Sequence, residues 1–222
     1  MEIRIDAHLR KLLPKARFAW AEFKNVTIKS SPPQLIQLIE KEKDTLSQLF
    51  TISTLATDKV INISRMAFKK VGTDPARYRP AQEALIRRIL QNKGIPFINN
   101  AVDINNYLSI KYRTPMGIYN QSVLDNVLTI GVGEEETFVS LSGRIIHCKN
   151  KIILKNQNNE VVGSPFVDSL KAKVDKNCTR LLHLVYLWPP WLKEEDFQYM
   201  KASFLNFLGG TASGYHYLPE EK

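Results

Sequence analysis

The sequence predicts an α+β fold, with a mixed or antiparallel β core flanked by helices. Two observations predict this class. Apolar residues recur at helical spacing over residues 33–50, 58–71 and 193–208. Between residues 127 and 163 the apolar period shortens towards two, and asparagine-rich turns separate short apolar runs. That pattern is typical of successive antiparallel strands.

The N-terminal region, residues 1–64, reads as a strand followed by a helix that packs on the core. Residues 17–29 predict a strand whose apolar side carries Phe18, Trp20, Val26 and Ile28. Pro33 has the fixed φ that suits the first turn of a helix, and it begins the predicted helix over residues 33–50.

Two amphipathic helices follow in the basic part of the chain. The first is predicted over residues 58–71 and ends at Gly72. The second begins near Pro80 and stops before Gly94, with Ile86 and Ile89 turned inward and its arginines outward. A further helix is predicted over residues 102–111.

The rest of the chain is predicted to be mainly strands and one last helix. The strands are expected at residues 127–132, 138–141, 144–148, 152–155, 160–163 and 179–187. The final helix, 193–208, ends at Gly209. Between the last strand and this helix stands Trp188-Pro189-Pro190-Trp191. We interpret it as a turn with both indoles packed inward, and a stacking platform for bases is the alternative.

Composition predicts a protein that folds around one large core and acts in a reducing cytoplasm. The chain has 222 residues, 44% of them hydrophobic, and no apolar run of the length that a membrane span needs. The first residues lack the apolar core of a secretory signal. The two cysteines, Cys148 and Cys178, are far apart and have no metal-ligand spacing, so we expect neither a disulfide nor a zinc site.

The charge distribution predicts an anionic partner. The formal net charge is +9, and most of the excess falls between residues 65 and 93, where only Asp74 and Glu83 oppose eight basic side chains. Net charge alone does not distinguish RNA from other polyanions, and the clustering of basic residues makes contacts to RNA phosphates one interpretation. The candidate RNA-binding residues are Arg65, Lys69, Lys70, Arg77, Arg79, Arg87 and Arg88. The alternative is that these side chains form an ordinary solvated helix surface.

A second unusual segment is residues 99–106, which place four asparagines and one aspartate in eight positions. Burying such side chains is costly unless they have partners. In a helix over residues 102–111, Asp103 would lie beside Asn106 on the first turns. The segment therefore predicts a polar site next to the basic helices. Alternatively, these groups cap the helix and satisfy turn backbone.

The order of these segments resembles the editing domain of the phenylalanyl-tRNA synthetase β subunit, called the B3/B4 domain, and especially its free-standing relatives. The resemblance spans roughly residues 65–190, and residues 191–222 would add a helix and a strand that complete the same domain. The matching residues are Tyr78-Arg79-Pro80, Glu83-Ala84-Leu85, Arg87-Arg88, Ile98-Asn99-Asn100, Val102-Asp103, Asn106-Tyr107, Pro115-Met116-Gly117, Asp168-Ser169, Lys173-Val174 and Thr179-Arg180.

This resemblance implies hydrolysis of the ester that links a wrong amino acid, typically tyrosine, to its tRNA. The ester is already activated, so the site needs neither a metal nor another cofactor, only an oriented water and a stabilised oxyanion. The implied partners are a mischarged tRNA and its amino-acid moiety, and no membrane. The implied catalytic residues are Asn100, Asp103, Asp168 and Ser169. The implied substrate-binding residues are Asn99, Asn106, Met116, Gly117 and Lys171.

On this interpretation, residues 99–106 and the loop at residues 168–169 face each other across a cleft, and Gly117 lets backbone approach the substrate. The second loop departs from the family pattern. Val167 stands where an arginine is usual, Ala172 and Asp175 where threonines are usual, and Lys171 near the place of a glutamate that reads tyrosine. Three functions therefore remain open. They are an editing hydrolase, an RNA-binding module without chemistry, and a protein that binds a small molecule such as an amino acid.

Overall fold

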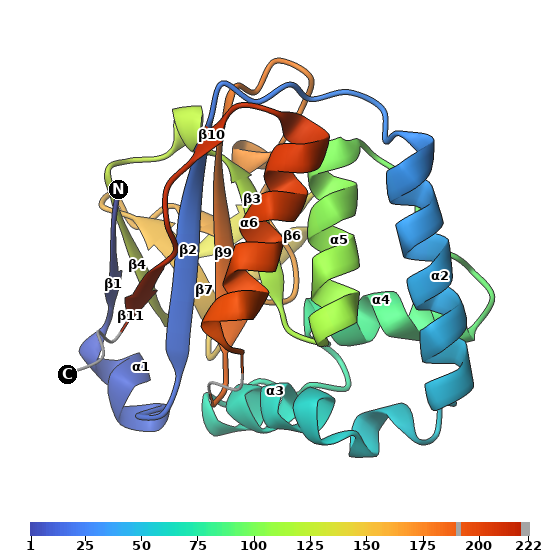
Figure 1. Cartoon of the computed structure of the whole chain (residues 1–222). Helices are drawn as coiled ribbons and strands as arrows, with labels where there is room; N and C mark the ends of the chain where they lie inside the picture. Colours follow the sequence, from blue (N-terminus) through green and yellow to red (C-terminus); the bar gives the residue numbers. More distant parts are fainter. Residues whose placement is uncertain (190–191, 219–222) are drawn as a thin grey trace.

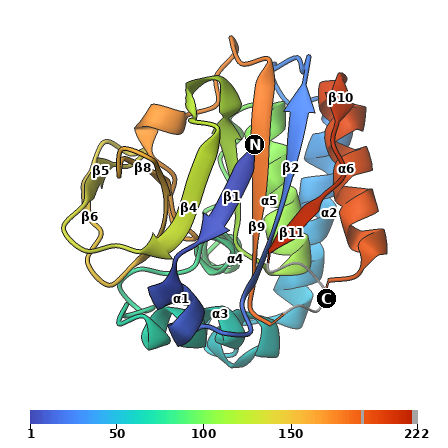
Figure 2. The same ribbon diagram turned by 90° about the vertical axis from the view of Figure 1, so that its left-hand side faces the viewer.

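The computed structural model describes residues 1–189 and 192–218, and it consists of two packed sheets with helices on one outer face (Figure 1). The predicted α+β class is confirmed. Figure 2 shows the two sheets between the β5–β6 hairpin on one side and the helical layer on the other. The described part of the chain holds no helix that is long and apolar enough to cross a membrane.

The larger sheet is built around two long strands. β2 (Arg17–Lys24) and β9 (Arg180–Leu187) pair antiparallel over their whole length, from Arg17 opposite Leu187 to Lys24 opposite Arg180. β3 (Met116–Asn120) pairs with the other edge of β9. Two short C-terminal strands, β10 (Thr211–Ala212) and β11 (His216–Leu218), pair with the outer edge of β2.

The second sheet is mixed and has four strands. Their order across the sheet is β1 (Glu2–Ile5), β4 (Val127–Val132), β7 (Ile152–Asn156) and β8 (Val161–Gly163), with only the β1–β4 pair parallel. β5 (Thr137–Val139) and β6 (Ile145–His147) form a separate hairpin. Side chains of both larger sheets share one core, in which Leu128 and Ile130 meet Phe18 and Leu184.

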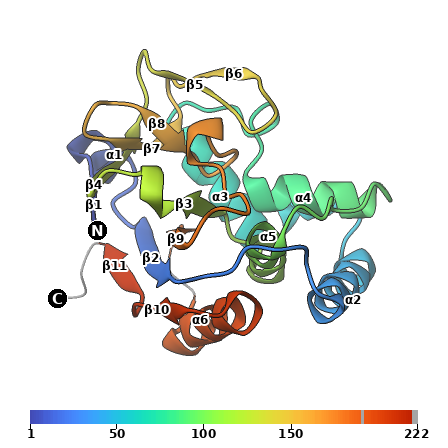
Figure 3. The same cartoon turned by 90° about the horizontal axis from the view of Figure 1, so that it is seen from above.

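Three helices cover the other face of the larger sheet (Figure 3). They are α2 (Pro33–Leu49), α5 (Asn100–Tyr112) and α6 (Glu194–Leu208). Leu35, Ile104 and Phe204 of these helices pack against Ala21 and Val185 of the strands. The remaining helices are α1 (Ala7–Leu12), α3 (Lys59–Lys70) and α4 (Ala81–Leu90). Short 3-10 turns lie at η1 (Leu55–Thr57), η2 (Gln121–Val123) and η3 (Leu170–Ala172).

Most predicted elements are present, with differences at particular residues. The strand predicted over residues 17–29 ends at Lys24, because Asn25 takes a positive φ of 56° that breaks the extended backbone. β1 and β3 were not predicted. Trp188 is buried, as expected for an inward indole, whereas Trp191 lies outside the described residues.

Candidate nucleic-acid interface

Helix α4 supplies the first wall of a cationic groove. Its apolar and inward polar positions, Gln82, Glu83, Ile86 and Ile89, are buried. The sequence places Arg87 and Arg88 in the last turn, where positive charge interacts favourably with the carboxyl end of the helix dipole. The Nε of Arg88 donates to the carbonyl of Gly94, at 3.1 Å, beyond the end of the helix.

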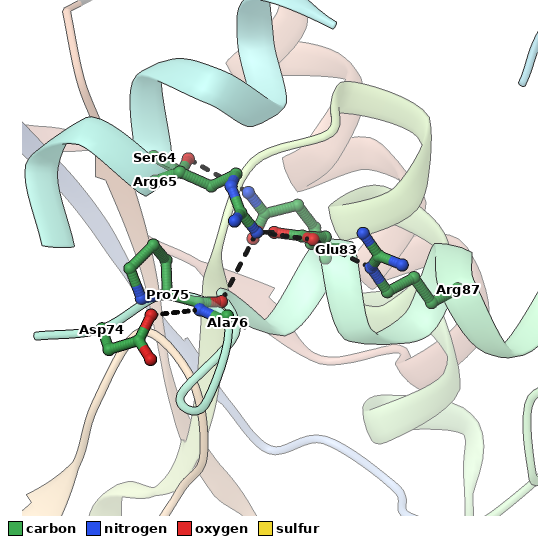
Figure 4. A network of polar contacts seen from close by, with 8 residues as sticks. Ser64, Arg65, Asp74, Pro75, Ala76, Glu83 and Arg87 are labelled. Carbon is green, nitrogen blue, oxygen red and sulfur yellow. Dashed lines mark hydrogen bonds and ion pairs between the residues drawn. The ribbon is translucent and has the colours of Figure 1, made fainter. Parts of the chain in front are cut away.

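A wholly buried carboxylate fixes one of these arginines. Glu83 accepts from Nη1 of Arg65 on α3 through both oxygens, at 2.8 and 2.9 Å, and from Nε of Arg87 at 2.9 Å. Figure 4 shows Glu83 between the two guanidinium groups. Arg65 also donates to the carbonyl of Pro75, at 3.4 Å. One negative charge thus orders two positive ones, and the network carries a net charge of +1.

The groove itself has a volume of about 470 Å³ and lies between α4 with its preceding loop and the β5–β6 hairpin. Five arginines line it, and no carboxylate stands among its lining residues in the described chain. These arginines are Arg77, Arg79, Arg87, Arg88 and Arg144. All except the half-buried Arg87 are exposed. We call this feature the arginine groove.

The turn of the β5–β6 hairpin supplies the opposite wall through Ser140, Ser142 and Arg144. The backbone N–H of Ser140 donates to the carbonyl of Arg144 at 2.8 Å, and the two serine hydroxyls are 3.1 Å apart. Gly143 has a φ of +80°, a conformation that a residue with a side chain rarely adopts, and this lets the turn close. The wall therefore presents the exposed Arg144 and Ser142 on a turn that the buried Ser140 holds together.

Aromatic rings separate the groove from the sheets. Phe166 meets Tyr78 edge to face, with ring centroids 5.5 Å apart. Two cations lie over the Tyr78 ring, the Arg77 guanidinium at 5.4 Å and the Lys151 ammonium at 4.3 Å. Burial, together with the nearby charge of Arg77, lowers the pKa of Lys151. Two basic side chains thus stand beside Tyr78, which lines the groove.

Four of the seven predicted RNA-binding residues, Arg77, Arg79, Arg87 and Arg88, come together in the arginine groove. Arg65 lies behind it, paired with Glu83. Lys69 and Lys70 are exposed in the last turn of α3 and do not line the groove. Sequence reasoning missed Arg144 and the two serines. The available signal was an arginine beside serines in the turn between two predicted strands.

Two of the asparagines predicted as site residues, Asn99 and Asn100, make hydrogen bonds to the backbone. Asn99 caps α5 by accepting from the N–H of Val102 at 2.9 Å, and its amide donates to the carbonyl of Val174 at 3.3 Å. Asn100 is wholly buried. Its oxygen accepts from the N–H of Lys29 at 2.9 Å, and its amide donates to the carbonyls of Thr27 and Phe207 at 2.9 and 3.0 Å. The capping alternative describes these contacts.

Asp103 is also committed to local contacts. It is 1% exposed and accepts from the Ser31 hydroxyl at 2.6 Å and from the N–H of Ile98 at 3.0 Å. Burial raises the pKa of its carboxyl, and these hydrogen bonds partly offset that rise. Asn106, one turn further along α5, is half-buried. We call Asn99, Asn100 and Asp103 the amide cluster.

The second predicted wall lies on the other side of the larger sheet. Asp168 is half-buried, with its carboxylate turned inward to hydrogen-bond the Tyr119 hydroxyl and the N–H of Ile118. Burial raises its pKa to about 7, against these hydrogen bonds, which lower it. Ser169 is buried and caps η3 through the N–H of Lys171. Lys171 is exposed and forms an ion pair with Glu160.

The space in front of the Gly117 Cα is taken by a side chain of the protein itself, and substrate contact at Gly117 stays a prediction. A Cβ on Gly117 would lie 2.2 Å from the Tyr119 hydroxyl, and one on Gly163 would lie 2.5 Å from the same ring. Glycine is thus required by the protein's own wholly buried tyrosine. Met116 points to the opposite face, into the core with α5. The sheet therefore separates the amide cluster from Asp168.

A larger cavity, of about 740 Å³, lies between the N-terminal and C-terminal strands. Its lining mixes Glu2 and Glu194 with Arg17 and contains none of the predicted site residues. Among the described residues, no group of three or more histidine, cysteine or acidic side chains is placed to hold a metal ion. Another hollow, of about 650 Å³, is lined by the predicted residues Ser169 and Lys171, and its charges are mixed because Glu136 and Glu160 line it too. The arginine groove combines four predicted residues with one dominant charge.

Comparisons with known proteins point to one family. Residues 63–199, more than half of the chain, match the model of the B3/4 domain. A solved structure of an N-terminal fragment of the phenylalanyl-tRNA synthetase β subunit from Pyrococcus horikoshii is similar, with 11% identity and a TM-score of 0.48. The match covers 99% of this chain and 54% of that fragment, so the chain spans about half of its length. No curated protein matches.

Proposed function

The chain belongs to the B3/4 domain family, and from this premise we propose that it binds tRNA through the arginine groove. One observation carries the proposal. Five arginines line a single groove, and no carboxylate stands among the described residues of its lining. The resemblance to a tRNA-editing domain makes tRNA the RNA class to test first.

Charge favours phosphate as the group that is bound. Guanidinium groups donate hydrogen bonds in a planar fork that matches phosphate oxygens, and they stay charged at every physiological pH. The only acidic group that contacts the groove arginines in the described chain is Glu83, which it shares between Arg87 and Arg65. The net positive charge of the groove therefore needs an anion from outside.

Preorganisation favours the same function. Arg87 is fixed by Glu83, and Arg88 is held against the carbonyl of Gly94, so neither side chain is fully mobile before binding. Ordering fewer rotatable bonds lowers the entropic cost of association. The groove therefore combines charge with partly fixed geometry, which supports binding through the RNA backbone rather than through base edges.

Burial argues for binding rather than ester hydrolysis at the residues predicted to be catalytic. Asn100 and Asp103 are buried and use their polar atoms on backbone and Ser31. The Asp168 carboxylate faces Tyr119, which fills the space beside Gly117. Water and an aminoacyl ester need access to a catalytic group. We therefore expect deacylation of mischarged tRNA at the rate of a buffer blank.

The experiment is a titration of labelled tRNA at several salt concentrations. We expect an affinity that falls steeply with salt, because phosphate binding releases counterions. The paired substitution Arg79→Gln with Arg88→Gln should weaken binding about tenfold or more and reduce the salt slope by about two.

Lys69→Gln with Lys70→Gln is the matched control, since it removes two positive charges from exposed residues outside the groove. It should weaken binding less than the groove pair does. Equal losses of tRNA affinity in the two variants would show that the effect depends only on net charge. An affinity that does not change with salt concentration would reject the proposal.

A further inference from the structure

We propose that the arginine groove binds a phosphate monoester, the doubly charged group that an RNA chain carries at its 5′ end. This inference rests on the proposed RNA binding and adds which part of the RNA enters the groove. It starts from the mismatch between the small volume of the groove, about 470 Å³, and the number of arginines around it.

Volume restricts what can enter. A space of this size is within the range of pockets that take one small ligand, whereas an RNA duplex is far wider. A duplex lying across the surface would offer its phosphates along a strip, each with one negative charge. Arginines that gather around one hollow instead fit one compact anion.

Charge favours a monoester over an internal phosphodiester. A monoester carries a charge of about −1.5 to −2 at pH 7 and offers three strong acceptor oxygens. Around the groove, five arginines and the neighbouring Lys151 are opposed by Glu83 alone among the described contacts, and Glu83 is shared with Arg65. A ligand with two negative charges therefore compensates this excess of positive charge better than a ligand with one.

The hairpin wall completes the recognition. Arg144 lines the groove from the hairpin and Arg87 and Arg88 line it from α4, so arginines stand on both walls. The buried Ser140 hydroxyl donates to the carbonyl of Arg144 at 3.0 Å and accepts from its N–H at 3.2 Å, so it holds the turn that carries Arg144. Donors arranged on two sides suit a terminal phosphate, whose oxygens point in several directions, better than one that continues into chain at both ends.

The test compares one tRNA prepared with a 5′ monophosphate and with a 5′ hydroxyl. We expect the phosphorylated form to bind about tenfold more tightly, an advantage that Arg144→Gln should abolish and Lys70→Gln should keep. Equal binding of the two forms would overturn this inference and leave RNA binding standing, whereas no binding of either form would overturn the proposed function as well.

Two further experiments test whether the bound phosphate belongs to RNA and whether it lies in the arginine groove. Adenosine monophosphate should compete only at concentrations far above those of the phosphorylated RNA, as expected when the rest of the RNA adds contacts. If it bound as tightly as the RNA, the RNA end would be rejected as the source. An advantage that survives in both Arg144→Gln and Arg79→Gln would overturn the assignment to this groove.

Discussion

The amide cluster and the arginine groove are both dense in polar side chains, and they differ in where the partners of those side chains are. Asn100 has a backbone partner for each of its polar atoms, and Asp103 accepts from Ser31 and Ile98. In the groove, one shared carboxylate opposes five lining arginines. A polar group that is satisfied within the chain stabilises the fold, whereas an unbalanced group is available to a ligand.

This contrast predicts that substitutions in the amide cluster change stability and leave RNA affinity alone, while substitutions in the groove do the reverse. Glu83 connects the two cases, because it is buried like the amide cluster and contacts a groove arginine.

Glu83→Gln should have the largest effect and should change both properties. Removing the carboxylate leaves the Arg65 and Arg87 guanidinium groups close together without their counter-charge. We expect the free energy of unfolding to fall by about 2–4 kcal/mol, since breaking a buried ion pair leaves charge uncompensated. Urea denaturation followed by tryptophan fluorescence measures it.

Glu160→Gln is the control for that substitution, because Glu160 pairs with Lys171 at an exposed position, where solvent screens the ion pair and it contributes little to stability. The Glu83→Gln variant should also bind RNA more weakly, as Arg87 loses its anchor. A variant with unchanged stability would show that this network does not organise the groove.

Asn100→Ala should reduce the free energy of unfolding by about 2–3 kcal/mol. It leaves the N–H of Lys29 and the carbonyls of Thr27 and Phe207 without their buried partner. Denaturant titration measures the loss, and Asn106→Ala at a half-buried position is the control. The folded variant should bind tRNA as the wild type does. Lost affinity with unchanged stability would instead move the amide cluster into the interface.

Asp168→Asn should change how stability depends on pH. The pKa of Asp168 is raised from 3.8 to about 7, so between these values the folded chain keeps a proton that the unfolded chain releases. Stability from this group is therefore present below about pH 4 and is lost as the pH rises towards 7. Asp168→Asn has no titrating carboxyl at this position, so its stability does not fall with pH for this reason.

The free energy of unfolding of Asp168→Asn, relative to wild type, should therefore rise by on the order of 1–3 kcal/mol between pH 4 and 7. Only the change with pH is diagnostic, since the substitution also alters the contact with Tyr119. Thermal unfolding of both proteins across this range measures the difference. A difference that stays constant with pH would show that the Asp168 carboxyl titrates normally.

Arg88→Gln should have the smallest effect on stability, within about 0.5 kcal/mol, because the side chain is exposed. Its effect on tRNA affinity should be a loss of about threefold to tenfold, with the salt slope reduced by about one. Lys11→Gln, at an exposed position of α1 outside the groove, serves as the control. Equal losses in the two variants would remove the distinction between the groove and the rest of the surface.

The sequence predicted site residues that lie close together along the chain, and it missed those that meet only through contacts between distant segments. Arg77, Arg79, Arg87 and Arg88 fall within one short segment, and amphipathic spacing placed those of α4 on its outer face. Arg144 escaped prediction because it reaches the groove through the hairpin turn, far away in sequence. The backbone partners of Asn100 come from segments at residues 27–29 and 207, which no local pattern links to it.

The amino-acid sequence predicted the α+β class, most of the helices and strands and the segment that carries the excess positive charge, because periodicity, turn residues and composition are local properties of the chain. The B3/4 family was indicated separately, by a resemblance between ordered motifs. Only the tertiary structure decided which polar residues are satisfied within the protein and which face a groove. It brought Tyr119 against Gly117 and Arg144 opposite α4. The physical reason is that burial and counter-charge depend on neighbours that are distant in sequence.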